Sequence, residues 1–131
     1  MGLFNTKYNF ETLLKKAVTK PAYQAEFYKR LLTEKLIVLT KTNIVPTGTY
    51  TTTENTPIDV LTLSDLRIPV FTSTDRIFDN GVIKNQVNFV ELEGQVLLKM
   101  LSNKTILINP YSDYGKELIP SEIENILRDD I

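Results

Sequence analysis

The feature that most constrains the fold is the order of the apolar patterns, in which stripes at helical spacing are interspersed with short apolar runs. Two helical stripes come first, at 10–18 and 23–34, with Asn9 as the expected N-cap of the first and Pro21 opening the second. Runs short enough for strands follow at 36–39, 58–63, 67–71, 105–108 and 117–119. This order predicts an α/β (α+β-like) fold with a mixed β-sheet of about five strands, helices packed on it, an N-terminal helical pair and a C-terminal helix.

Three residue pairs have the spacing of capping boxes and predict where three further helices begin. The pairs are Thr72 with Asp75, Asn88 with Glu91, and Ser121 with Glu124. We expect the first of these helices to run through Phe78 and to end at Asn80-Gly81. We expect the second to run to about Ser102, with Gly94 inside it. An interior glycine costs a helix about 1 kcal/mol relative to alanine, but its small size would let a neighbouring segment pack closely.

Prolines and threonines mark two segments as unusual. Pro69 cannot donate a hydrogen bond to a neighbouring strand, so we expect it at a sheet edge or at a strand start. Residues 41–57 hold seven threonines together with Pro46, Gly48 and Pro57. Because threonine suits exposed strand positions while proline and glycine interrupt them, we expect a mobile loop or an edge hairpin there.

The composition excludes most enzymatic chemistry. The 131 residues suit one domain, spanning 1–131, and they include no histidine and no cysteine. Disulfides, thiolate nucleophiles, histidine bases and zinc sites built on His or Cys are therefore absent. The sequence holds no glycine-rich phosphate loop and no calcium-loop spacing, and its paired carboxylates, such as Glu91 and Glu93, point to different sides of a predicted helix. We therefore expect no catalytic residue, no metal site, no cofactor and no enzymatic activity.

The charge is balanced overall but unevenly distributed. The net charge is −1, yet residues 1–35 carry seven Lys/Arg against three Asp/Glu, and the remainder carries eight against thirteen. Aromatic residues lie among the basic ones, but Phe10 and Phe27 fall on predicted core faces, so we expect no nucleic-acid binding. The apolar runs are too short to span a membrane, and the N-terminus lacks the apolar segment of a signal peptide. We therefore expect a cytoplasmic protein with no membrane partner.

Polar residues follow two of the predicted strands and form the candidate site. Thr72, Ser73, Asp75 and Arg76 follow the strand at 67–71, and Asn109, Tyr111, Ser112 and Asp113 follow the strand at 105–108. In α/β sheets, ligands favour the crevice beyond the carboxyl ends of strands, so the two turns would share one rim if their strands are parallel neighbours. The alternative is structural: Asn109-Pro110 forms an Asx-type turn, and Asp75-Arg76 is a local cap with a solvent-facing arginine.

Three segments, taken in order, carry a family resemblance. They are Phe27-Tyr28-x-x-Leu31-Leu32 leading into Leu36-Ile37-Val38, then Ile68-Pro69-Val70-Phe71-Thr72-Ser73-x-Asp75-Arg76, and finally Ile106-Leu107-Ile108-Asn109-Pro110-Tyr111-Ser112 followed by Gly115 and Leu118. This order resembles the N-terminal domain of the SseB family over roughly residues 10–128. The resemblance implies a compact α/β domain of a bacterial cytosolic protein, and longer members look like they carry a second, C-terminal domain. Members have been linked loosely to sulfurtransferase genetics, but a sulfurtransferase would use a cysteine persulfide, which this chain cannot form.

Two functions remain open. The first is a non-enzymatic protein-interaction or regulatory module, such as an adaptor or an immunity-like binder, whose partner is another protein. It is favoured by the missing catalytic residues, the uneven charge and the threonine-rich segment. The alternative is a sensor of a small ligand, either an amino acid or an anionic metabolite. A pocket walled by Arg76 and Asn109 would favour the sensor, and a flat surface there would argue against it.

Overall fold

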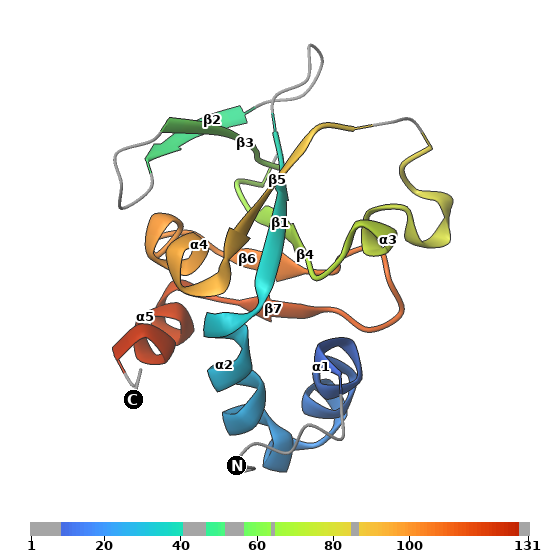
Figure 1. The fold of residues 1–131 in the computed structure, drawn as a ribbon, viewed down its shortest axis with the longest axis vertical. Helices are drawn as coiled ribbons and strands as arrows, with labels where there is room; N and C mark the ends of the chain where they lie inside the picture. Colours follow the sequence, from blue (N-terminus) through green and yellow to red (C-terminus); the bar gives the residue numbers. More distant parts are fainter. Residues whose placement is uncertain (1–8, 41–46, 52–56, 64, 85–86, 129–131) are drawn as a thin grey trace.

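The computed structural model describes residues 9–40, 47–51, 57–63, 65–84 and 87–128. Its helices are α1 (Phe10–Thr19), α2 (Gln24–Thr33), α3 (Thr74–Ile77), α4 (Gly94–Met100) and α5 (Pro120–Arg128), with 3₁₀ turns η1 (Pro21–Tyr23) and η2 (Asp79–Gly81). Its strands are β1 (Lys35–Leu39), β2 (Thr47–Thr51), β3 (Pro57–Leu61), β4 (Ile68–Phe71), β5 (Phe89–Glu93), β6 (Ile106–Ile108) and β7 (Lys116–Leu118). A five-stranded mixed sheet has the order β5-β1-β4-β6-β7, and β2 and β3 form a separate two-stranded sheet (Figure 1). The predicted fold class is confirmed.

The N-terminal helical pair follows the local sequence signals. The Asn9 side chain accepts a hydrogen bond from the Thr12 backbone N–H at 2.7 Å, which caps α1 as predicted. Pro21 opens η1, which leads directly into α2. The rings of Phe10 and Phe27 stack with centroids 5.4 Å apart, and both are buried. These aromatic residues therefore serve the core that holds the two helices together.

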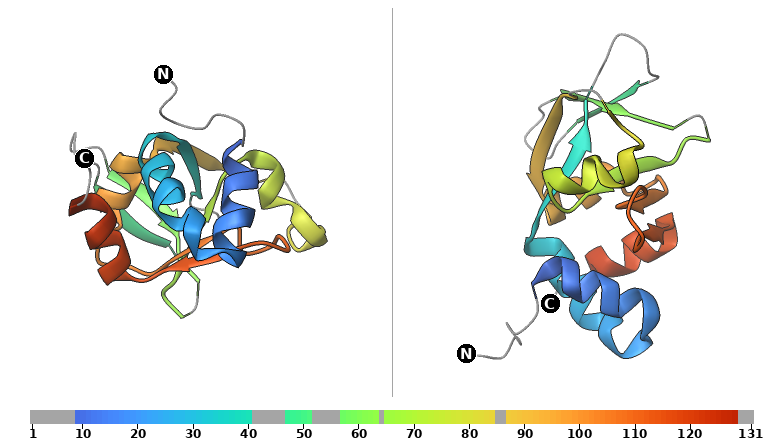
Figure 2. Two further views of the ribbon diagram at one scale, coloured as in Figure 1. Left: turned by 90° about the horizontal axis from the view of Figure 1, so that it is seen from below. Right: turned by 90° about the vertical axis from the view of Figure 1, so that its right-hand side faces the viewer.

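Alternation along the strands divides the core between the two faces of the sheet. In β1, Leu36 and Val38 pack into the larger core, which also contains buried residues of α1, α2, α4 and α5. Ile37 and Leu39 point the other way, into a smaller core that includes Phe71 and Ile77. The four longer helices thus cover one face, whereas α3 and residues of β3 cover part of the other (Figure 2).

The predicted helix over 89–102 is wrong in its first half. Residues 89–93 form β5, which pairs antiparallel with all of β1, from Lys35 opposite Glu93 to Leu39 opposite Phe89. Asn88 and Glu91 therefore cap no helix, and α4 begins only at Gly94. The apolar spacing of residues 89–93 fits either a helix or a strand, and pairing with β1 decides in favour of the strand. Within β5, Val90 packs against the helix-side core whereas Phe89 and Glu91 are exposed, as expected of a strand.

Gly94 lies where α4 meets α2, and it confirms that a small residue is needed for close packing. A Cβ atom at this position would overlap the Leu31 carbonyl oxygen and lie 2.8 Å from the Leu31 carbonyl carbon. The Gly94 backbone N–H also donates to the Glu34 carbonyl oxygen at 2.8 Å. The glycine is therefore the first residue of the helix rather than an interior one, and its missing side chain lets two backbones touch.

Three finer predictions need correction. Pro69 lies in β4, which is inside the sheet between β1 and β6; pairing with β1 covers only Val70 and Phe71, so Pro69 is not required to donate on that side. Thr72 and Asp75 form no capping box, since the N-cap residue of α3 is Ser73, which makes no side-chain cap bond. Helix α3 also ends before Phe78, at Ile77, and the chain turns through left-handed residues at Asn80 and Gly81.

The last helix likewise begins elsewhere than predicted. Helix α5 starts at Pro120, so Ser121 and Glu124 do not cap it. Instead, Glu122 Oε1 accepts a hydrogen bond from the Ile119 backbone N–H at 3.3 Å. Proline suits the first helical position because its missing N–H would have no partner there. None of the helices in the described ranges is long and apolar enough to cross a membrane.

The threonine-rich segment is described only in part. Strands β2 and β3 pair antiparallel from Thr47 opposite Leu61 to Thr51 opposite Pro57, as expected of a hairpin. A further bridge pairs Thr40, just after β1, with Val60. Residues 41–46 and 52–56 lie outside the described residues, so the expectation of a mobile loop has no outcome there.

Candidate functional site

The two polar turns share one rim of the sheet. Strands β4 and β6 are parallel neighbours, with Ile68 opposite Ile106 and Val70 opposite Ile108. Their carboxyl ends lie together on the right-hand side of Figure 1, where α1, α3 and the chain between β6 and β7 also meet. The Asn109 backbone N–H continues the ladder by donating to the Val70 carbonyl oxygen at 2.8 Å. The condition for a shared rim is therefore met.

Asn109 joins the two strand ends through its side chain. Its Oδ1 accepts from the Thr72 backbone N–H at 3.0 Å, and its Nδ2 donates to Thr72 Oγ1 at 2.9 Å. The residue is 2 % exposed and has a φ of 51°, a left-handed conformation that asparagine adopts more readily than most side chains. An Asx-type turn is therefore the wrong interpretation, since the amide bonds to the neighbouring strand end rather than to its own turn.

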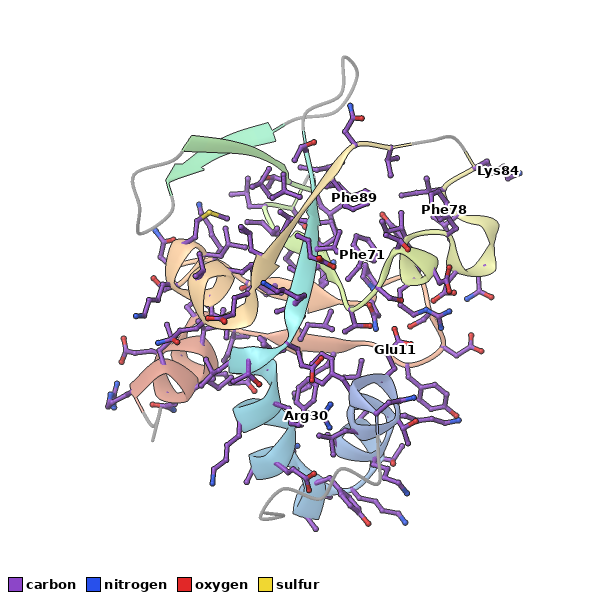
Figure 3. The ribbon with its side chains drawn as sticks, in the orientation of Figure 1. Glu11, Arg30, Phe71, Phe78, Lys84 and Phe89 are labelled. Atoms are coloured by element: carbon purple, nitrogen blue, oxygen red, sulfur yellow. The ribbon has the colours of Figure 1, made fainter. Side chains whose placement is uncertain are left out.

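Glu11, in the first turn of α1, ties that helix to the same rim. Its Oε2 accepts hydrogen bonds from Thr72 Oγ1 at 2.6 Å and from Ser73 Oγ at 2.9 Å. Figure 3 shows Glu11 at the end of α1 that faces this turn. Arg76 Nε lies 3.8 Å from Glu11 Oε2 and 3.4 Å from Asp79 Oδ2. The expectation of a solvent-facing Arg76 in a local cap is therefore wrong, because Arg76 is half-buried between two carboxylates.

A second set of bonds joins η2 to the chain after β6. Asn80 Nδ2 donates to the Tyr111 carbonyl oxygen at 2.7 Å and lies 3.4 Å from Asp113 Oδ1. Ser112 Oγ bonds to the carbonyl oxygens of Asn109 and Tyr114, which holds the turn in shape. The turn then passes so close to Asn109 that a Cβ at Gly115 would lie 2.8 Å from the Asn109 carbonyl oxygen. Gly115 is thus required by a close approach of two backbones.

Between these segments lies an open hollow, which we call the rim hollow, of about 360 Å³. Four of the predicted site residues line it: Arg76, Asn109, Ser112 and Asp113. The sequence reasoning missed several others, chiefly Glu11, Lys15, Asp79, Asn80 and Tyr114. Glu11 and Lys15 belong to a helix whose sequence signals concern only its own cap and core face. Asn80 carried a local signal, but that signal pointed to a turn.

The remaining predicted residues have other places. Thr72 and Ser73 hold the rim together through the bonds described above, whereas Asp75 is exposed and does not line the hollow. The Tyr111 ring packs against Phe71 with centroids 5.7 Å apart, on the side of the smaller core. Burial there raises the pKa of the Tyr111 phenol above its usual value. Tyr111 is thus a packing residue of the rim rather than part of the hollow's lining.

A second, more apolar hollow of about 480 Å³ lies between α2 and α5. Tyr28, Leu32, Glu122 and Ile126 are among its lining residues. The Tyr28 hydroxyl donates to Glu122 Oε2 at 3.1 Å. Burial raises the pKa of Tyr28 to about 12, and the hydrogen bond and negative charge of Glu122 act in the same direction.

Across the described ranges, no three acidic side chains gather in a way that could hold a metal ion.

Comparisons with known proteins identify the family. The family model described as the SseB protein N-terminal domain matches residues 10–125. The chain is 28 % identical over 132 residues to Protein SseB of Escherichia coli (strain K12) and, equally, to Protein SseB of Shigella flexneri. Each alignment covers 93 % of this chain and 46 % of the relative, so the chain spans about half the length of those proteins. It matches no solved structure. By its family match over nearly its whole length, the chain belongs to the SseB N-terminal domain family.

Proposed function

We propose that this domain is a non-catalytic binding module that holds a small polar ligand in the rim hollow. The observation that carries the proposal is the hollow itself, which is walled by Arg76 and Asn109 at the carboxyl ends of two parallel strands. Its volume of about 360 Å³ is at the small end for ligand sites and suits a metabolite better than a peptide. Hydrogen bonds join its walls to one another, so little order must be created on binding.

The chemistry of the lining supports binding rather than catalysis. The sequence has no histidine or cysteine, so a base and a nucleophile would have to come from carboxylates and hydroxyls. The nearest such arrangement is Glu11 with the hydroxyls of Thr72 and Ser73. There one carboxylate oxygen accepts from both hydroxyls and also faces Arg76. That oxygen is fully engaged in holding α1 against the rim, which favours a structural role for all three residues.

Thermal unfolding in the presence of defined small molecules tests the proposal. The probes are the common amino acids and a set of small organic anions, each at about 10 mM and at constant ionic strength. A ligand with a dissociation constant of about 1 mM would then stabilise the domain by ~1.4 kcal/mol and raise the melting temperature by about 5 °C. We expect at least one probe to do so with the wild type and to lose most of its effect with Arg76→Gln.

Arg128→Gln is the matched control, because Arg128 pairs with Glu124 on the exposed face of α5, away from the rim hollow. It removes the same charge and should leave every ligand-induced shift intact. A probe whose shift survives Arg76→Gln binds elsewhere. If no probe raises the melting temperature of the wild type, the proposal of a small-ligand site is wrong.

A second candidate is the protein-interaction module. The observation in its favour is that Phe78 and Val82 are 44 % and 58 % exposed, while Asp79 and Asn80 between them line the rim hollow. Large apolar side chains beside a hollow can anchor a partner. A bound protein that is lost with Val82→Ser but retained with Arg76→Gln would favour this candidate over the first. Equal recovery with wild type and Val82→Ser would count against it.

A further inference from the structure

The charges around the rim hollow narrow the class of ligand. Three carboxylates line it, those of Glu11, Asp79 and Asp113, together with two cations, those of Lys15 and Arg76. The lining therefore carries a formal charge of −1, so a simple anion gains no net electrostatic attraction from it. Specific binding requires complementary charge on the ligand, since unmatched or like charges are penalised. The lining suits a ligand that carries charges of both signs.

Three of these charged side chains already form ion pairs with one another. Arg76 lies between Glu11 and Asp79, at 3.8 Å and 3.4 Å. Neither contact is a hydrogen bond, and both Arg76 Nε and Asp79 Oδ2 are buried atoms with no hydrogen-bond partner among the described residues. These two atoms lie 3.4 Å apart without a hydrogen bond between them. Because both atoms are buried, the pair acts on a ligand in the hollow through its charges rather than through these atoms.

The other two charges are not paired with each other. Lys15 Nζ lies 4.6 Å from the centroid of the Tyr114 ring, and it forms no ion pair with any residue in the described ranges. Asp113 likewise forms no ion pair there, and its Oδ1 has only the Asn80 amide at 3.4 Å. One ammonium, on α1, and one carboxylate, on the chain between β6 and β7, are therefore separately available to a ligand.

The positions of these walls are set by the bonds that join them. Glu11 fixes the start of α1, which carries Lys15, against Thr72 and Ser73, which lead into α3, the helix that carries Arg76. Asn80 fixes η2 against the segment that carries Asp113. Preset opposite charges recognise a small dipolar molecule better than either charged half of it alone.

We infer that the ligand of the rim hollow is a small zwitterion, whose ammonium group faces Asp113 and Asp79 and whose carboxylate faces Lys15 and Arg76. This inference rests on the proposed function and names its ligand class. It replaces the broader alternative of an amino acid or an anionic metabolite, because it excludes simple anions.

Isothermal titration with matched sets of probes tests the inference. One set is glycine, acetate and methylammonium, and the other is 4-aminobutyrate, butyrate and propylammonium, all at the same ionic strength. We expect a zwitterion to bind at least about tenfold more tightly than either matched ion, as one added charge contact would give. Asp113→Asn should reduce the preference for the zwitterion over the anion to below about threefold. Glu124→Gln on α5 is the matched control and should leave it unchanged.

The outcomes separate this inference from the function on which it rests. If either matched ion, the anion or the cation, binds as tightly as its zwitterion, the charge argument is wrong and the binding function stands. If a zwitterion is preferred but Asp113→Asn changes nothing, the assignment of the two charged walls is wrong. If none of the six probes binds and the broader thermal screen is also blank, both the inference and the proposed function fail.

Discussion

Replacing Gly94 with alanine is the sharpest test of how this fold is packed. The glycine begins α4, and its Cα rests against the last turn of α2. A Cβ atom there would overlap the Leu31 carbonyl oxygen, lie 2.8 Å from the Leu31 carbonyl carbon and lie 3.3 Å from the Glu34 carbonyl oxygen. Ordinary contacts of a Cβ atom are 3.4–4 Å. All three atoms belong to backbone, so no side chain can rotate away, and α4 must move relative to α2.

The size of the effect follows from three terms. Overpacking of this kind costs up to ~3 kcal/mol. Moving α4 also weakens the 2.8 Å bond from the Gly94 N–H to the Glu34 carbonyl oxygen, which is worth about 1 kcal/mol. Alanine has a better helix propensity, which returns at most ~1 kcal/mol and less at a first helical position. We therefore expect Gly94→Ala to lower the free energy of unfolding by about 3 kcal/mol.

Urea unfolding followed by circular dichroism measures this difference. With a slope of about 1.5 kcal/mol per molar urea, the midpoint should fall by about 2 M with an unchanged slope. Gly81→Ala is the matched control, because Gly81 has a φ of 66° and no atom within 4 Å of a built Cβ. It should cost only the left-handed strain, about 1 kcal/mol. A Gly94→Ala variant that is as stable as wild type, or no less stable than Gly81→Ala, would refute the packing argument.

Two further predictions concern the tethers of the helices. Because the unfolded Tyr28 phenol loses its proton near pH 10.0 and the folded one near pH 12, the stability this residue contributes is complete below pH 10 and is lost as pH rises to about 12. Tyr28→Phe also loses the bond to Glu122, and it should make the decline of the unfolding free energy over that window shallower. Urea unfolding at several pH values measures this decline, and an equal decline with pH in wild type and Tyr28→Phe would contradict the prediction. Glu11→Ala, which removes the acceptor of the Thr72 and Ser73 hydroxyls, should lower the urea stability by ~2 kcal/mol, whereas Glu11→Gln should cost less than half as much because an acceptor oxygen remains. Wild-type midpoints for both variants would show that Glu11 does not tie α1 to the rim.

Local signals predicted the elements whose stability is decided locally. The cap of α1 at Asn9 and the apolar stripe of the helix lie within ten residues of each other, so both can be read from the sequence. The segment after Asn88 is different, because its apolar spacing fits a helix through about residue 101 as well as a strand followed by a helix. What decides is β1, some fifty residues earlier, whose edge pairs with β5 along its whole length. No pattern within 89–102 contains that information. Within this segment, Gly94 is the residue that marks the boundary, because the strand ends and the helix begins there.

The residues of the rim hollow also fall into two groups, those that local sequence predicts and those that only tertiary contacts bring there. Thr72 and Asn109 could be predicted because each follows a recognisable strand, and the carboxyl ends of parallel strands meet at one edge. Their partner Glu11 lies 61 residues before Thr72 and looks like an ordinary acidic residue in a first helical turn. The helix dipole alone explains a carboxylate at that position. Nothing in the local sequence therefore indicates that Glu11 also bonds to Thr72 and Ser73. The same holds for Lys15, a surface cation by sequence that the fold places over Tyr114. The charge pattern on which the ligand class depends therefore exists only once α1 has packed against the rim. Glu11→Ala loosens α1 but removes none of the four residues assigned to the ligand, which are Lys15, Arg76, Asp79 and Asp113. It should nevertheless weaken the binding of the zwitterion.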